Sequence, residues 1–284
     1  MDFLKRLFSL LFSHRKKTPT KSNFEPQEPI AHFHKMQHQG NAYYIDIKQP
    51  YHVDGTLKPQ TIQKVFEFAY KMAFTSEGAH RSSRSGGSHA RRNGEIFANT
   101  FQGKIAECAA CNFFYKLDSK VMPDFSVYQL GKWDTVDLSV CGKEIGIKST
   151  KHFGQLLLLE TKDWDAKGRY IPNIKSGVCV YDYIVVIRVN PSCEDLLKSR
   201  RLLYSNDVDK SVLEKLICSQ TWTYNFAGYI THAELLQIIK SRQVLPRRAL
   251  LNGKTIMDAE NYYVQIGDLH PLNSIDIKIE SEEV

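Results

Sequence analysis

The chain has 284 residues and a formal net charge of +7 at pH 7, and 42% of its residues are hydrophobic. That length can bury one sizeable core with appendages or two small ones, and the hydrophobic content is ordinary for a soluble globular protein. No apolar run approaches the roughly 18 residues of a membrane-spanning helix, so we do not expect an integral membrane protein. The six cysteines lie mostly among apolar residues, which favours buried thiols in a reducing cytoplasm over a disulfide framework.

The N-terminal segment predicts a short amphipathic helix with a broad apolar face. Its apolar residues are Phe3, Leu4, Leu7, Phe8, Leu10, Leu11 and Phe12, and Arg15, Lys16 and Lys17 follow them. Because residues 1–17 are too few to cross a membrane, we expect peripheral contact with a membrane surface. The alternative is a helix that docks on a partner protein or on a second copy of the chain, giving a homodimer. With the polar residues that follow, residues 1–40 are expected to act as a tether.

Two longer segments predict α-helices behind a short strand at residues 41–47. The first helix is expected at residues 58–74, where apolar side chains recur at helical spacing. The second is expected from about Gly94 to Tyr115, and Glu107 interrupts its otherwise small, apolar residues. Burying a carboxylate without a partner is costly, so a functional or paired role is favoured for Glu107.

A segment rich in Arg, Ser and Gly precedes and enters this second helix. Its basic residues are Arg81, Arg84, Arg91, Arg92 and Lys104. Arginine side chains and backbone amides in such a segment can approach phosphates closely, and a net basic charge favours a polyanionic partner. We therefore expect these residues to bind DNA, with a solvated surface loop as the alternative.

Residues 133–138 and 144–149 predict two short strands that carry charged side chains. Asp137 lies within an apolar alternation, and strand alternation places Glu144 and Lys148 on one face of the second strand. Carboxylates are the hard oxygen ligands that Mg²⁺ prefers, and the ion activates water and neutralises charge in phosphodiester hydrolysis. A nearby lysine can orient that water. These residues predict a Mg²⁺ site, with Mn²⁺ as a substitute ion.

The order of helical Glu107, strand Asp137 and strand Lys148 resembles the PD-(D/E)XK superfamily of restriction-endonuclease-like nucleases. The resemblance covers roughly residues 95–190. It implies an α/β fold with a mixed central sheet flanked by helices, and Mg²⁺-dependent cleavage of DNA. In that pattern Asp137 and Glu107 are metal ligands and Lys148 is the motif lysine. The chain departs from the pattern at Gly146, which stands where the family has an acid.

Three carboxylates are candidates for the acid missing at Gly146. Glu107 ranks first, as a helical ligand beside Asp137. Glu144 ranks second, because it shares a face with Lys148 but is displaced from Gly146 by roughly 6 to 7 Å at a rise of about 3.3 Å per residue. Glu160 ranks third. It ends the apolar run 155–159, which we expect to form a hairpin with the preceding strand and to bring Glu160 beside Glu144.

The apolar run within residues 178–189 predicts a central strand covered on both faces. Two helices and a strand are expected after it, at residues 211–217, 232–241 and 261–266, with Thr231 and Glu234 forming a capping box. Residues 41–205 are assigned to the nuclease-like domain and residues 206–284 to a small C-terminal accessory element.

These features together predict a Mg²⁺-dependent deoxyribonuclease, with bacterial or phage-borne restriction or defence as its setting by analogy. The alternative is a catalytically inactive, membrane-tethered DNA-binding adaptor that keeps the fold, and an RNA-directed nuclease is a third reading. The chain has no G-x-x-x-x-G-K-[ST] loop, so no nucleotide cofactor is expected.

Overall fold

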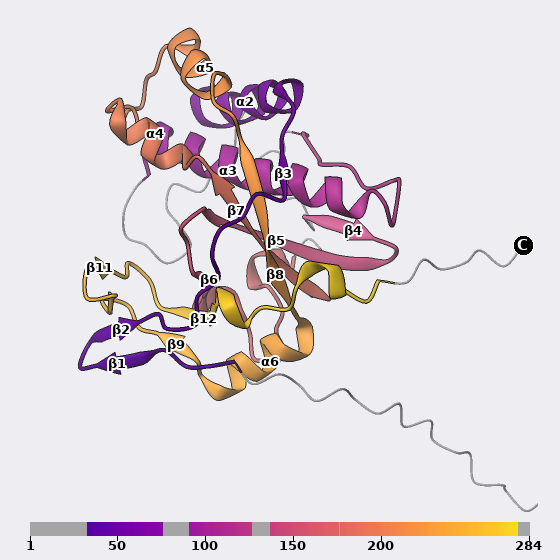
Figure 1. Ribbon diagram of the computed structural model, residues 1–284, viewed down its shortest axis with the longest axis vertical. Helices are drawn as coiled ribbons and strands as arrows, with labels where there is room; N and C mark the ends of the chain where they lie inside the picture. The colour runs from indigo at the N-terminus through magenta and orange to yellow at the C-terminus, as the bar shows by residue number, and fades with distance from the viewer. Residues whose placement is uncertain (1–32, 76–90, 127–136, 176, 278–284) are drawn as a thin grey trace, which may run out of the picture. The chain divides into compact units, whose positions relative to one another are not determined.

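The computed structural model describes residues 33–75, 91–126, 137–175 and 177–277 (Figure 1). The expected N-terminal helix, Arg81, Arg84 and most of the expected strand at 133–138 lie outside the described residues. No described helix is long and apolar enough to cross a membrane.

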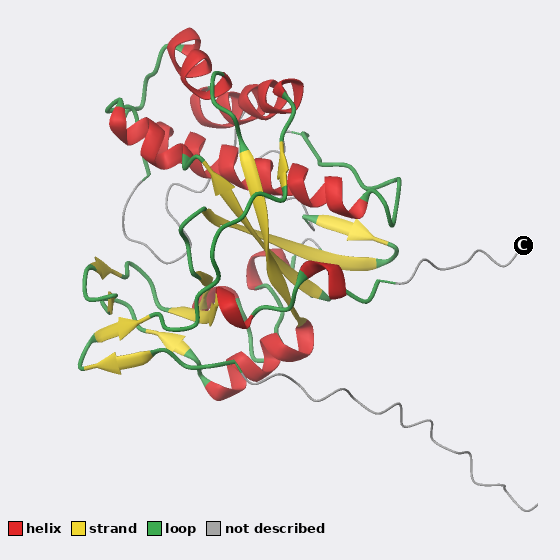
Figure 2. Cartoon of the chain, viewed as in Figure 1, coloured by secondary structure: helices red, strands yellow, loops and turns green. Residues whose placement is uncertain are grey.

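A five-stranded mixed sheet organises the described chain (Figure 2). Its spatial order is β3 (Gly55–Thr56), β8 (Thr223–Thr231), β7 (Tyr183–Asn190), β5 (Lys143–Lys151) and β4 (Leu138–Val140). β5 and β7 run parallel in continuous register from Ile145↔Tyr183 to Lys151↔Val189, whereas the other neighbours pair antiparallel. Cys141 and Gly142 join β4 to β5 with positive φ at both positions, as a tight hairpin turn requires.

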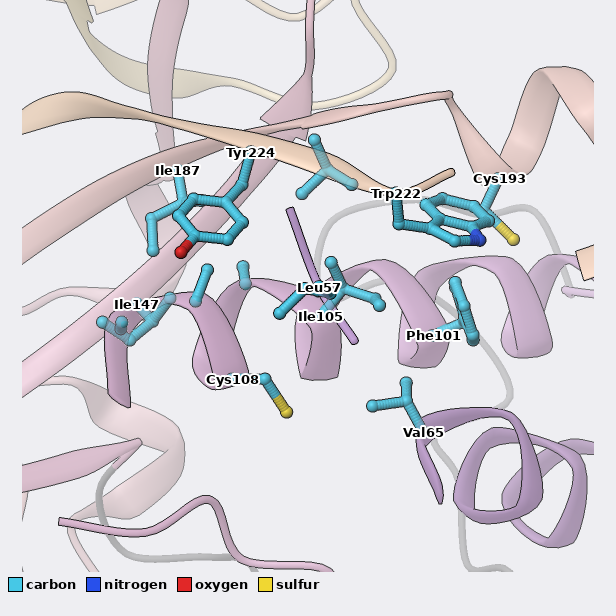
Figure 3. Close-up of a cluster of buried hydrophobic side chains, with 14 of the residues drawn as sticks. Leu57, Val65, Phe101, Ile105, Cys108, Ile147, Ile187, Cys193, Trp222 and Tyr224 are labelled. Carbon is cyan, nitrogen blue, oxygen red and sulfur yellow. The ribbon is translucent and has the colours of Figure 1, made fainter. Parts of the chain in front are cut away.

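One face of this sheet is covered by helices. They are α2 (Pro59–Phe74), α3 (Asn93–Phe114), α4 (Cys193–Ser199) and α5 (Lys210–Cys218). α3 lies against the sheet, and its Phe101 and Ile105 pack with buried sheet residues such as Ile187 in the largest apolar cluster (Figure 3). Trp222 is fully buried there, 4.8 Å from Phe101 between ring centroids. Burial of these large side chains supplies the main stabilisation of this layer.

The opposite face is covered by α6 (His232–Ser241) and by a three-stranded sheet. That sheet has the order β6 (Leu156–Glu160), β12 (Asn261–Gln265) and β9 (Val244–Leu245). Leu157, Val264 and Leu235 pack here against Ile184 and Val186 of the central sheet. A third sheet contains β1 (Gln37–Gln39), β2 (Ala42–Tyr44), β10 (Leu250–Leu251) and β11 (Thr255–Ile256). Single-turn 3₁₀ helices occur at Thr161–Asp163, Ile171–Asn173, Ile266–Asp268 and Leu272–Ser274.

The architecture confirms an α/β protein with a mixed central sheet and helices on both of its faces. The helices predicted at 58–74, from Gly94, at 211–217 and at 232–241 are present within one or two residues of the expected bounds. Thr231 accepts from the Glu234 backbone and Glu234 accepts from the Thr231 backbone, so the expected capping box is confirmed.

Two expectations about strand placement are corrected. β6 does not form a hairpin with β5, because β7 and β4 take the two sides of β5, and β6 pairs with β12 instead. Residues 206–284 do not form an appendage, since β8 lies inside the central sheet between β3 and β7. The described residues 33–277, apart from the gaps named above, form one compact unit.

A buried arginine links this sheet to the chain before β3. Arg188 of β7 has no exposed surface. It donates to Asn225 Oδ1 of β8 and to the backbone carbonyls of Gln49 (2.8 Å) and Pro50 (2.8 Å). Burial lowers its pKa from the ordinary value, although the nearby Tyr51 and Asp54 oppose that effect. The interaction partners are neutral oxygens. The Gln49 carbonyl also accepts from Gln155 Nε2 (2.9 Å), so Asn225 Oδ1 and the Pro50 carbonyl depend most on the guanidinium.

Replacing Arg188 by Met should therefore destabilise the fold by on the order of 3 kcal/mol, because several buried acceptors lose their donor at once. Urea unfolding followed by circular dichroism would measure the change. The matched control is Arg169→Met, whose side chain is 43% exposed and pairs with Asp165. Surface pairs contribute roughly 0 to 1 kcal/mol, so equal losses in both variants would contradict the structural role of Arg188.

The first described residues are held by an ion pair. His34 donates its backbone N–H to Asp268 Oδ2 (2.9 Å), and its Nδ1 lies 2.8 Å from Asp268 Oδ1. The hydrogen bond and charge of Asp268 raise the pKa of His34 above its ordinary value of 6.5.

We expect an NMR titration to give a pKa above 6.5 for His34, and Asp268→Asn to lower it. Because the folded-state pKa is raised, the contribution of this contact to stability is fully present below the unfolded pKa and is lost as the pH rises through the folded pKa. A wild-type pKa that Asp268→Asn leaves unchanged would show that the pair does not form in solution.

Candidate functional site

The alternation of β5 places the motif residues on the face opposite the four covering helices. Ile145 and Ile147 belong to the helix-side core. Glu144, Gly146 and Lys148 therefore face the other way, toward the aromatic residues before β7. The structure thus brings Glu144 and Lys148 onto one face, as the sequence predicts.

Asp137 lies beside Gly146 at the start of β4. The register pairs Leu138 with Ile145, so the preceding residue, Asp137, falls opposite Gly146 and on its face. Asp137 Oδ2 accepts a hydrogen bond from the Ile147 backbone N–H at 2.6 Å. This bond continues the ladder one step beyond β4 and fixes the carboxylate between Glu144 and Lys148 along the strand.

The position of the missing acid is packed against an aromatic ring. A Cβ atom at Gly146 would approach the ring of Tyr181 to 3.2 Å, so Tyr181 would have to shift for any side chain there. Tyr181 is buried and lies 6.1 Å from the ring of Tyr170. Lys148 Nζ lies 5.5 Å from the Tyr170 centroid, within cation–π range. Lys148 has no ion pair with any residue that the structure describes.

The surroundings of Glu144 raise the pKa of its carboxyl group. Burial raises its pKa first, the charge of Asp182 raises it further, and a hydrogen bond with Ser139 opposes both effects. Its Oε2 atom is buried and has no hydrogen-bond partner in the described chain. A buried carboxylate oxygen without a donor is unfavourable unless a proton or a cation compensates it.

Asp182 also lies at the candidate site, although it was not among the residues predicted from the sequence. It directly precedes β7, and its Oδ2 accepts from the Glu144 backbone N–H at 2.9 Å while its own N–H donates to the Glu144 carbonyl at 2.8 Å. The sequence does carry a signal for Asp182. An acid just before the strongest predicted strand lies beside the start of whichever strand pairs with it in parallel. The choice of neighbour, however, is not encoded locally.

Glu107 does not join this group. α3 covers the helix-side face of β5, and Glu107 forms an ion pair there with Lys104. Lys104 also donates to the Asp124 carbonyl (2.7 Å) and lies 5.0 Å from the Phe68 centroid. Glu107 therefore has the paired role that the sequence predicts for a buried carboxylate. Its position does not support ranking it first among the acids that could replace the one missing at Gly146.

The same ion pair corrects the expectation that Lys104 binds DNA. Lys104 is only 7% exposed, and its ammonium is engaged by Glu107, so it is not available to a phosphate. Among the other predicted DNA ligands, Arg91 is half-buried and Arg92 is exposed at the start of α3.

Glu160 also lies away from Lys148. It ends β6 opposite Asn261 of β12. Leu157 and Leu159 face the core shared with the central sheet. Leu156 and Leu158 face the other side of β6, where they belong to a separate apolar cluster. Glu160 lies two residues after Leu158. Strand alternation therefore directs its side chain to the same side of β6 as Leu156 and Leu158, away from Lys148.

The described residues at this site offer Mg²⁺ two carboxylate ligands, those of Asp137 and Glu144. No three His, Cys, Asp or Glu side chains come together as metal ligands in the described residues. Asp137 and Glu144 share the face of Lys148, and Mg²⁺ in proteins is commonly held by one or two carboxylates together with water and substrate phosphates. The unpaired Oε2 of Glu144 is consistent with that arrangement. The three-ligand set that includes Glu107 does not fit.

The six cysteines are free thiols, as the sequence predicts. Burial raises the pKa of Cys108 and of Cys111 to about 12, so neither is a reactive thiolate at neutral pH.

Comparison of the chain with models of known families, with curated proteins and with solved structures gave no match.

The ion pair predicts that Glu107→Ala loses on the order of 3 kcal/mol of unfolding free energy, because Lys104 is left as a buried charge without its partner. Urea unfolding measures this loss. The double variant Lys104→Met with Glu107→Met removes both charges and should recover most of it. If Glu107→Ala kept full stability, the buried pair would not have the structural role described above.

Proposed function

We propose that this chain is a nuclease-like protein that hydrolyses phosphodiester bonds in DNA with Mg²⁺, using the face of β5 that carries Lys148. One observation carries the proposal: the β4–β5 register places Asp137 opposite Gly146, between Glu144 and Lys148 on one face. A carboxylate and a lysine on adjacent antiparallel strands are the arrangement that the PD-(D/E)XK resemblance implies, and the mixed sheet is compatible with such a core.

Each residue has a role that its surroundings support. Asp137 keeps one carboxylate oxygen on the Ile147 amide, which orients the other for a cation. Glu144 would supply the second carboxylate, since a nearby cation offsets the burial that raises its pKa. Mg²⁺, when bound, supplies a polarised water and neutralises charge on the phosphate. In this proposal the Lys148 ammonium, which lies over the Tyr170 ring, orients the attacking water.

A second candidate function is supported by the packing at Gly146. Tyr181 fills the space next to this glycine, and the acid of the family pattern has no room without a shift of that ring. With Glu107 and Glu160 both directed elsewhere, the chain also fits a DNA-binding adaptor that has kept a nuclease-like sheet and lost hydrolysis. Both candidates share DNA as partner, for which the net charge of +7 is favourable.

Cleavage of supercoiled plasmid DNA by the full-length protein with Mg²⁺ or Mn²⁺ separates the two candidates. We expect metal-dependent nicking that EDTA stops. Asp137→Asn, Glu144→Gln and Lys148→Met should each reduce the rate by about 100-fold or more, because each removes a charge at the reacting phosphate.

The control variant is Glu160→Gln, which removes a carboxylate of the same type whose side chain leaves β6 on the side away from the site. It should cleave at the wild-type rate. Binding of DNA without cleavage by the wild-type protein would favour the adaptor, and loss of activity in Glu160→Gln but not in Glu144→Gln would reverse the assignment of the second carboxylate.

A further inference from the structure

A groove of about 1090 Å³ lies next to the proposed site and is not used by it. Its walls come from the first turns of α3, from the C-terminal half of β5 with the following loop, and from the segment around β10 and β11. Ser149 and Thr150, which line it, directly follow Lys148 on β5. The groove therefore involves the same strand as the proposed catalytic face, at residues beyond Lys148.

The C-terminal half of β5, which lines this groove, carries backbone N–H groups on its β4 side. Glu144 directs its N–H toward Asp182 on the β7 side, so the alternate residues Ile147 and Ser149 direct theirs toward the β4 side. β4 pairs with β5 only as far as Ile145, and the Asp137 carboxylate takes the amide of Ile147. Beyond that point no described strand pairs with this edge of β5.

Two exposed aromatic side chains flank the groove. Phe153 is 58% exposed and Tyr204 is 61% exposed, although both are large enough to be buried in most folds. Lys151 Nζ lies 5.6 Å from the Phe153 ring centroid and places a positive charge beside that ring. Ile256, on the opposite wall, is 67% exposed. Exposed apolar surface gathered around one groove marks a binding surface more often than chance exposure does.

The lining also contains polar side chains, most of them neutral. Its amide and hydroxyl side chains come from Asn99, Gln102, Ser149, Thr150, Gln155, Asn252 and Thr255, and its lysines are Lys48 and Lys151. The acids Glu194 and Asp258 also line the groove, and Lys151 is paired with Glu194 (3.4 Å) and Asp195 (3.1 Å). Amide groups suit base edges, the exposed Lys48 suits a phosphate, and exposed aromatic rings suit base stacking.

We propose that this groove binds one unpaired nucleic-acid strand, with bases stacked on Phe153 and Tyr204, and leads it to the Asp137–Lys148 face. The inference rests on the proposed action on DNA and adds the substrate class. Stacking on a protein ring requires a base whose face is free, which a base inside a duplex does not offer. The chain would thus act at single-stranded regions, ends or flaps.

Fluorescence anisotropy with a labelled oligothymidine of about 12 nucleotides tests the groove, beside a hairpin duplex of equal length and in EDTA to prevent cleavage. Phe153→Ala and Tyr204→Ala should each weaken binding of the single strand about 5- to 100-fold, the effect of losing one stacked base. Tyr115→Ala is the matched control, because Tyr115 is 59% exposed at the far end of α3 and does not line the groove. Circular dichroism and thermal melting establish that all three variants are folded.

The outcomes separate this inference from the proposed function. Single-strand binding that both groove variants lose and the control keeps supports the groove, and the same pattern with oligouridine supports it with RNA as the strand. Binding that the groove variants leave unchanged overturns it, even if plasmid nicking by the wild type stands. Groove-dependent binding without any metal-dependent cleavage overturns the hydrolytic function and keeps the groove. Absence of nucleic-acid binding by the wild type overturns both.

Discussion

The parallel pairing of β5 with β7 is the constraint on which the remaining structure depends. Its register, from Ile145↔Tyr183 onward, fixes which side chains of β5 face the helices and which face the second layer. A shift by one residue would exchange the two sets, sending Lys148 into the apolar helix-side core. The buried residues on both faces of β7 make that shift costly, so the packing of the core holds the candidate site in place.

The buried charged groups near this sheet differ in their partners, and this difference separates structural residues from candidate functional ones. Lys104 and Glu107 form an ion pair within the helical layer, so neither charged group is available to bind a ligand. Glu144 has no such partner, and Asp182 raises its pKa further. A buried carboxylate oxygen without a donor, such as Glu144 Oε2, is a candidate for function, whereas paired carboxylates are more often structural. This contrast is why Glu144, with Asp137, carries the proposed function in place of Glu107.

The proposed site and the groove share a single strand. Lys148 belongs to the face toward Tyr170, and the next two residues line the groove with its exposed aromatic rings. Among the described residues the β4–β5 pairing reaches Ile145, and the Asp137 carboxylate takes the next amide on that side, that of Ile147.

The sequence by itself determined the elements whose signals are local. The helix periodicity at 58–74, the capping box of Thr231 and Glu234 and the alternation that groups Glu144 with Lys148 are set by neighbours a few residues apart. Only the tertiary structure decided that β6 pairs with β12, that β8 enters the central sheet and that Glu107 lies across the sheet from Lys148. Strand partners far apart in the chain compete for the same edges, and the outcome depends on the packing of the whole core, which no local pattern contains.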